Sequence, residues 1–140
     1  MFARIDHWIG RTLFVPLIIR LCQRTGQSQY AVSRLFWFMA ALDGLYHADT
    51  MVAAVLFGAV SVVMMVTAAL LADRPTRSAM PFRLLAVVFL SLDLIEGAVR
   101  GQWVGVEFWM LVLVAEYASS ITTIPPAETK KRAARVAKTG

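Results

Sequence analysis

The segment 51–72 is a run of 22 residues without an ionisable side chain, and Asp49 and Asp73 stand on either side of it. At about 1.5 Å of rise per residue, a helix over this segment is long enough to cross the roughly 30 Å hydrocarbon core of a bilayer. A soluble domain of only 140 residues hardly needs a helix that is apolar on every face. The sequence therefore indicates a membrane protein.

The composition agrees with this interpretation, and from its length of 140 residues we expect one compact unit and no separate soluble domain. Hydrophobic residues make up 59% of the chain, which is above their share in ordinary soluble domains. Cys22 is the only cysteine, which excludes an intrachain disulfide and argues against a cysteine-based metal site. The excess of arginine over lysine is typical of a GC-rich bacterial genome.

Three further segments are long enough to span if the charged residues near their ends reach the interface. They cover residues 30–48, 81–99 and 103–121. The last two cannot form one continuous helix, because it would be far longer than the membrane is thick. Gly101 lies between them, and glycine is the usual residue of sharp turns, so the sequence predicts a tight hairpin there.

The N-terminal segment 1–24 has the pattern of an amphipathic helix. Arg4, His7 and Arg11 share one helix face, and apolar side chains share the opposite face. This pattern predicts a helix that lies in the plane of the lipid headgroups. The alternative is a first spanning helix that is broken at Pro16.

The basic residues predict how the spans are oriented. With four spans and both termini on one side, all of the 14 Lys and Arg residues except Arg100 lie on that side. The positive-inside rule makes it the cytoplasm. We therefore expect an all-α integral membrane protein of the bacterial inner membrane, a four-transmembrane-helix bundle with an amphipathic in-plane N-terminal helix and both termini cytoplasmic.

Acidic residues at membrane depth are rare, and they usually have a function or a partner. In this topology Asp43, Asp93, Glu96 and Glu107 fall in the outer halves of their helices. Asp93, Glu96 and Arg100 share one helix face, and the order of Glu96 and Arg100 favours an i,i+4 ion pair. These five residues are the candidates for a polar, outward-opening site that holds a cation or relays protons. The alternative is that they are wetted or paired near the interface and fix helix packing, and the sequence favours this alternative.

The tail 125–140 is basic and adjoins the last predicted span, which favours a topology signal and a lipid anchor over a nucleic-acid site. The expected partners are therefore a bilayer with anionic headgroups, further copies of the chain or other membrane subunits, and no nucleic acid. No metal site or cofactor is expected, because His7 lies outside the predicted spans, His47 lies at the outer end of one, and a single histidine with scattered carboxylates is poor evidence for metal ligation. The residues predicted to contact lipid headgroups are Arg4, Arg11, Lys130, Lys131, Arg132 and Arg135.

The sequence lacks a glycine-rich phosphate loop, an HExxH or CxxC motif, and a plausible catalytic triad. This absence predicts a non-enzymatic protein, a structural or accessory subunit of a larger membrane assembly for secretion, for conjugation or encoded by a phage. Two alternatives remain open: a holin-like pore-former built by self-association, and a small protein that translocates cations or protons through the outer-half carboxylates.

Overall fold

The computed structural model describes residues 1–71, 74, 75 and 77–120, and helix is the regular structure throughout these residues. The all-α prediction is confirmed. The elements are α1 (Phe2–Ile9), the π-helical turn η1 (Gly10–Phe14), α2 (Val15–Thr25), α3 (Gln29–Tyr46), α4 (Met51–Leu70), α5 (Met80–Arg100) and α6 (Val104–Ser120).

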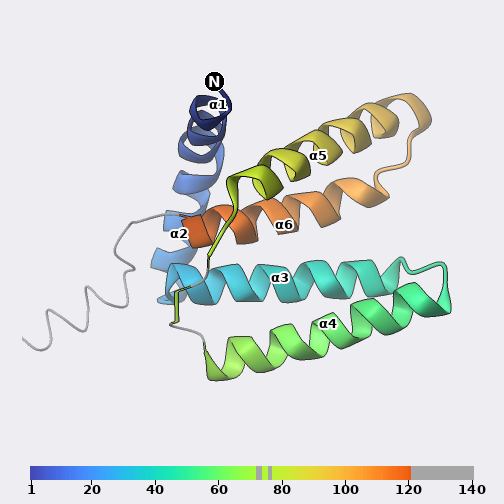
Figure 1. Cartoon of the computed structure of the whole chain (residues 1–140), viewed down its shortest axis with the longest axis horizontal. Coiled ribbons are helices and arrows are strands. Elements are labelled where there is room, and N and C mark those ends of the chain that lie inside the picture. Colours follow the sequence, from blue (N-terminus) through green and yellow to red (C-terminus); the bar gives the residue numbers. More distant parts are fainter. Residues whose placement is uncertain (72–73, 76, 121–140) are drawn as a thin grey trace, which may run out of the picture.

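Local chemistry explains where the long helices begin and end. The Ser28 hydroxyl accepts a hydrogen bond from the backbone N–H of Ala31, and the Thr50 hydroxyl accepts one from Ala53, each at 3.2 Å, so both residues cap helix N-termini. Gly101 follows α5 in the left-handed conformation, with a φ of 72°, which side chains other than glycine rarely adopt. The chain reverses there, as the hairpin prediction requires (Figure 1).

The four long helices form an open row in the order α4, α3, α6, α5 (Figure 1). The hairpins α3–α4 and α5–α6 pack against each other through α3 and α6. In the described structure α4 and α5 do not contact each other. The sequence predicts a bundle of four helices, and in the structure these helices pack side by side as a row. Ala40 of α3 and Ala118 of α6 are fully buried, and small residues let two helices approach closely.

The N-terminal segment lies across one end of this row (Figure 1). α1 contacts α5, η1 contacts α6, and α2 contacts α6 and α3. We call this the α1 end, and the opposite end, which holds the α3–α4 and α5–α6 connections, the turn end. The helix is not broken at Pro16: Val15 N–H donates to the Gly10 carbonyl in the wider π turn just before it, and α2 begins with Pro16 in its first turn, where the missing N–H costs little.

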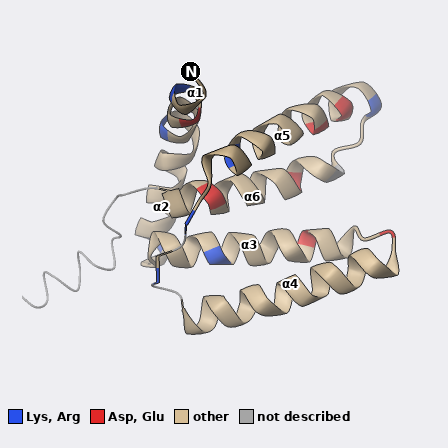
Figure 2. Ribbon diagram, viewed as in Figure 1, with Lys and Arg blue, Asp and Glu red and all other residues tan. Residues whose placement is uncertain are grey.

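Among the described helices, α4 is the one that is long and apolar enough to cross a membrane by length and composition. Its apolar side chains are mostly exposed, and it carries no charged residue along its whole length (Figure 2). The other three long helices differ for identifiable reasons. α6 has 17 residues, α3 carries Arg34 and Asp43, and α5 carries charges near both ends.

Candidate functional site

A bidentate ion pair between Asp6 and Arg83 is the centre of the α1 end. Arg83 Nε donates to Asp6 Oδ1 at 3.0 Å, and Arg83 Nη2 donates to Oδ2. Two parallel hydrogen bonds of this kind make the strongest arginine–carboxylate geometry. Each side chain is only 10% exposed. The pair therefore fixes α1 to the first turn of α5, although the two residues are 77 positions apart in the sequence.

Tyr117, near the end of α6, completes this contact. Its hydroxyl donates to Asp6 Oδ1 at 2.9 Å, and its ring lies 5.5 Å from the guanidinium carbon of Arg83. The ring of Phe14 stacks on the Tyr117 ring, with the ring centroids 4.6 Å apart. One carboxylate thus receives donors from α5 and α6, which ties the N-terminal segment to both helices.

Ser78 extends the cluster to Glu116. The Ser78 hydroxyl accepts a hydrogen bond from Arg83 Nη1 and donates one to Glu116 Oε2, each at 2.7 Å. Since a hydroxyl can accept and donate at once, the buried charges of Arg83 and Glu116 are joined through it. We call Asp6, Ser78, Arg83, Glu116 and Tyr117 the clamp.

Buried residues at every fourth position form a stripe along the N-terminal segment, and this stripe lets the segment pack closely against α6. Its members are Asp6, Gly10, Phe14, Ile18 and Cys22, and all are buried. A four-residue repeat drifts by about 40° per step on an ideal helix, and the wider π turn reduces this drift. At Gly10 a Cβ atom would stand 2.8 Å from the Tyr117 ring, so this position has room for glycine alone.

The clamp also changes the acidity of Asp6. Hydrogen bonding from Arg83 is the largest influence, and it lowers the pKa of the Asp6 carboxyl below its ordinary value. Burial alone would raise this pKa, because it disfavours the charged form. The carboxylate is therefore held ionised by its partners.

A cavity of about 300 Å³ adjoins the clamp between α3, α4 and α6. We call it the polar pocket. The Arg34 side chain is buried beside it and donates to the Arg74 carbonyl at 2.7 Å. The polar side chains that line it are Ser33, Arg34, Thr67, Arg77, Glu116 and Ser119.

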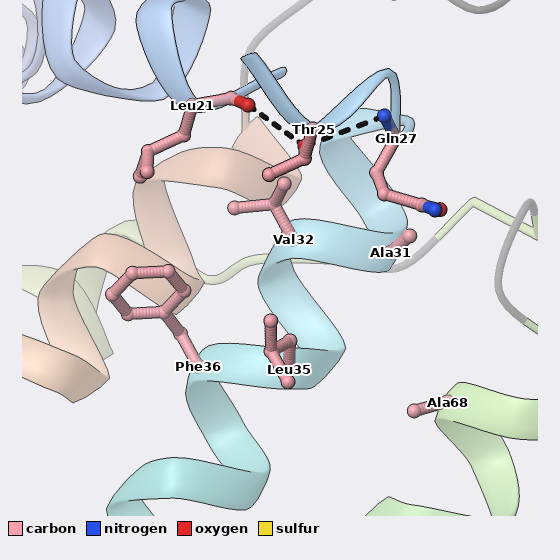
Figure 3. A pocket seen from close by; sticks show the side chains of 8 residues that line it. All are labelled: Leu21, Thr25, Gln27, Ala31, Val32, Leu35, Phe36 and Ala68. Carbon is pink, nitrogen blue, oxygen red and sulfur yellow. Dashed lines mark hydrogen bonds between the residues drawn. The ribbon is translucent and has the colours of Figure 1, made fainter.

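A second cavity of about 300 Å³ lies between α2, α3 and α4 and is mainly apolar (Figure 3). Val32, Leu35 and Phe36 of α3 line it, and Ala68 of α4 faces them (Figure 3). Thr25 closes its α2 side and donates a hydrogen bond to the Leu21 carbonyl at 2.7 Å. No charged side chain lines this cavity within the described structure.

The carboxylates predicted to form an outward site lie towards the turn end, and among the described residues no hydrogen bond or ion pair links one of these carboxylates to another. Glu96 and Arg100 form the i,i+4 ion pair that their spacing predicts, at 2.8 Å, and both are exposed. Asp93 packs against Gly105 of α6, and Glu107 is exposed in the first turn of α6.

Among the described residues, the polar contacts of Asp43 are with the next turn of the chain. Asp43 Oδ1 lies 3.4 Å from the His47 ring nitrogen Nδ1, one turn further along the chain. α6 lies between α3 and α5, and no hydrogen bond or ion pair among the described residues connects Asp43 to Glu96 or Glu107. A transport role for these groups stays a prediction.

Of the six residues predicted to contact lipid headgroups, the structure describes two. Arg4 and Arg11 are exposed on the N-terminal segment and line a shallow groove with His7 and Trp8. The tail positions Lys130, Lys131, Arg132 and Arg135 lie outside the described residues.

The sequence interpretation missed the clamp. Asp6 is the one acidic residue in a basic amphipathic segment, and it falls four residues before Gly10 in a stripe that ends at Cys22. That stripe was the available signal. The partners of Asp6 could not be read from the sequence, because Arg83 and Tyr117 are 77 and 111 positions away.

Among the described residues, no three His, Cys, Asp or Glu side chains gather in a way that could hold a metal ion. Comparisons of the chain with protein-family models, with curated proteins and with solved structures found no match.

Proposed function

We propose that the chain is a non-enzymatic, four-span protein of the bacterial inner membrane that serves as a structural or accessory subunit of a larger membrane assembly. The observation that carries this proposal is the exposed surface of α4. Val55, Leu56 and Leu70 are each more than 60% exposed on a helix without a charge. Contact of such an apolar surface with water is unfavourable, whereas contact with lipid or with the helices of another protein is favourable.

The open row supports a role in assembly. Because α4 and α5 lie at opposite edges, each of them offers a face to a neighbour that a closed bundle would cover. Leu92, Ile95 and Val99 of α5 are exposed, so the second edge is apolar as well. A chain of this shape can pack into a larger helical array from either edge.

The N-terminal segment at the α1 end supports the proposed orientation of the chain in the membrane. The N-terminal segment lies across the row, as an in-plane helix does, and its exposed side carries Phe2, Trp8 and Leu13 beside Arg4 and Arg11. Apolar and basic side chains together are what an interfacial helix inserts between anionic headgroups. On this proposal the α1 end faces the cytoplasm and the turn end faces outward.

Site-specific photo-crosslinking in native membranes tests the subunit role. A photoreactive residue at Val55 of α4 or at Leu92 of α5 should give discrete adducts with other membrane proteins. The matched control is the same residue at Ala40 of α3, which is fully buried and should give none. Adducts with lipid alone would contradict an assembly role.

The same experiment separates this proposal from a pore-former. One observation favours self-association: a Cβ at Gly58 of α4 meets nothing within 4 Å, so this small residue lies open to another helix. A pore-former predicts a ladder of self-adducts from α4, together with abrupt growth arrest on induction. A structural subunit predicts adducts with other proteins and tolerated expression.

A further inference from the structure

The helices α3 and α4 are in close contact at the turn end and diverge towards the α1 end (Figure 1). At the turn end Gly44 of α3 lies so close to the Phe57 ring of α4 that an added Cβ atom would overlap it. At the α1 end the mainly apolar cavity of about 300 Å³ lies between the two helices and α2 (Figure 3). We call it the apolar cavity. Ala31 of α3 and Ala68 of α4 line it, so small side chains leave this space open.

The polarity of the lining changes along the apolar cavity. Thr25 and Gln27, on the α2 side at the α1 end, are polar and exposed. The lining residues further along the chain, Val32, Leu35 and Phe36, lie on the first turns of α3 and are apolar. A ligand that matches this lining therefore has one polar end and one apolar end.

Two arginines adjoin the polar end of the apolar cavity. Arg24 follows the lining residue Leu21 by three positions on α2, so the two side chains are neighbours on the helix surface. Arg20 lies one turn earlier on the face of Arg24, and both arginines are exposed. Residues 7–42 include no Asp or Glu, and in the described structure neither arginine makes an ion pair. The polar end thus offers positive charge to an anion.

We propose that the apolar cavity holds one acyl chain of an anionic phospholipid, with the lipid phosphate at Arg24 and Arg20. The planar guanidinium group matches phosphate oxygens, and basic side chains beside a gap between membrane helices are typical of headgroup sites. This inference rests on the proposed membrane topology, because the α1 end then lies at the inner leaflet. The polar end of the cavity is then at headgroup depth, and its apolar end is in the hydrocarbon region.

The first test compares two lipids that have the same acyl chains and differ in headgroup charge. The purified full chain in detergent is exposed to phosphatidylglycerol and phosphatidylcholine in equal amounts, and bound lipid is counted by native mass spectrometry. We expect at least about a fivefold preference for phosphatidylglycerol, because the choline ammonium offsets the phosphate charge that the arginines attract. Equal binding of the two lipids would overturn the proposal.

Charge variants assign the preference to the site. Arg24→Gln should bring the preference for phosphatidylglycerol close to one. The matched control is Arg74→Gln, which removes the same charge from another exposed arginine and should keep the preference. If both variants reduce it equally, the attraction is diffuse and the headgroup site is wrong.

A second pair of variants tests whether an acyl chain occupies the cavity. Ala68→Leu fills the space between α3 and α4 and should reduce bound phosphatidylglycerol about tenfold, because the new side chain displaces several methylene groups. Ala69→Leu makes the same change at the exposed neighbouring position of α4 and should leave binding unchanged. If Ala68→Leu instead dissociates dimers and leaves the lipid count unchanged, a second copy of the chain occupies the cavity and the proposal is wrong.

The lipid site and the proposed function fail on different measurements. If Ala68→Leu and Arg24→Gln leave lipid binding unchanged while α4 crosslinks to other membrane proteins, the site is wrong and the subunit role stands. If both variants lose the lipid but topology labelling shows a chain that crosses the membrane once, the site stands and the four-span proposal is wrong.

Discussion

Both ends of the helix row carry charged side chains, but they use them differently. At the α1 end Asp6 and Arg83 pair across 77 residues of sequence in a buried contact, and Tyr117 and Ser78 complete their hydrogen bonds. At the turn end Glu96 and Arg100 pair within one helix turn and stay exposed. Burial and the sequence distance between partners, rather than the presence of charge, therefore show which contacts hold distant segments together.

The two ends differ because their ion pairs differ in exposure to solvent. An exposed pair exchanges contacts with water for contacts with each other and gains little. A buried pair has lost its water, so each member depends on the other, and removal of one leaves a charge without a partner. The α1 end should therefore be sensitive to substitution, and the turn end should be tolerant.

Arg83→Met should have the largest effect. It leaves Asp6 buried without its main partner, which should lower the free energy of unfolding by about 3–5 kcal/mol. The measurement is a denaturant titration of the purified protein in mixed micelles. Arg100→Met is the control at the turn end and should cost at most about 1 kcal/mol. Similar losses at both ends would remove the distinction.

Tyr117→Phe should cause the second-largest loss in the free energy of unfolding. It keeps the ring that stacks on Phe14 and removes the hydroxyl that donates to Asp6, so we expect a loss of about 1.5–3 kcal/mol. Tyr46→Phe provides the comparison, because Tyr46 is 85% exposed at the turn end. A loss at Tyr46 as large as that at Tyr117 would argue against the clamp.

Gly10→Ala tests the close approach of the N-terminal segment. The new methyl group meets the Tyr117 ring, and such overpacking typically costs about 1–3 kcal/mol. Gly58→Ala in α4 has open space and should instead stabilise by up to about 1 kcal/mol through helix propensity. Opposite signs in unfolding titrations are expected, and stabilisation at Gly10 would show that η1 does not pack on α6 as described.

The pH dependence should also differ between the ends. The pKa of Asp6 is lowered in the folded state, mainly by hydrogen bonding from Arg83, so its contribution is complete above the unfolded-state value of about 3.9 and is lost as the pH falls through the folded-state value. The wild-type chain should lose stability on acidification below about pH 4. Asp6→Asn should lose less over the same range, and parallel acid profiles would contradict the assignment.

Glu96→Gln should have the smallest effect. It removes an exposed ion pair, so we expect a change of less than about 0.5 kcal/mol in the free energy of unfolding. The same titration measures it. A loss comparable to that of Tyr117→Phe would show that the turn end holds a connected polar site after all.

Local patterns explain what the sequence could predict. The apolar run of α4, the hairpin at Gly101 and the Glu96–Arg100 pair depend on neighbours within a few residues, and the structure shows each of them. The open row and the clamp depend on contacts between distant segments. No periodicity within segment 1–24 reveals that Asp6 meets Arg83, and the polarity of Asp6 interrupts the stripe that packs on the row.

Thiol labelling of intact cells tests the membrane topology most directly. In a Cys22→Ala background, single cysteines replace four exposed residues, Asp49 and Gln102 at the turn end and Thr25 and Ala79 towards the α1 end. The proposed topology predicts that a membrane-impermeant reagent modifies the cysteines at 49 and 102 at once, and those at 25 and 79 only after the membrane is disrupted. If the chain crosses the membrane at α4 alone, the cysteines at 79 and 102 will react together, and the four-span proposal is wrong.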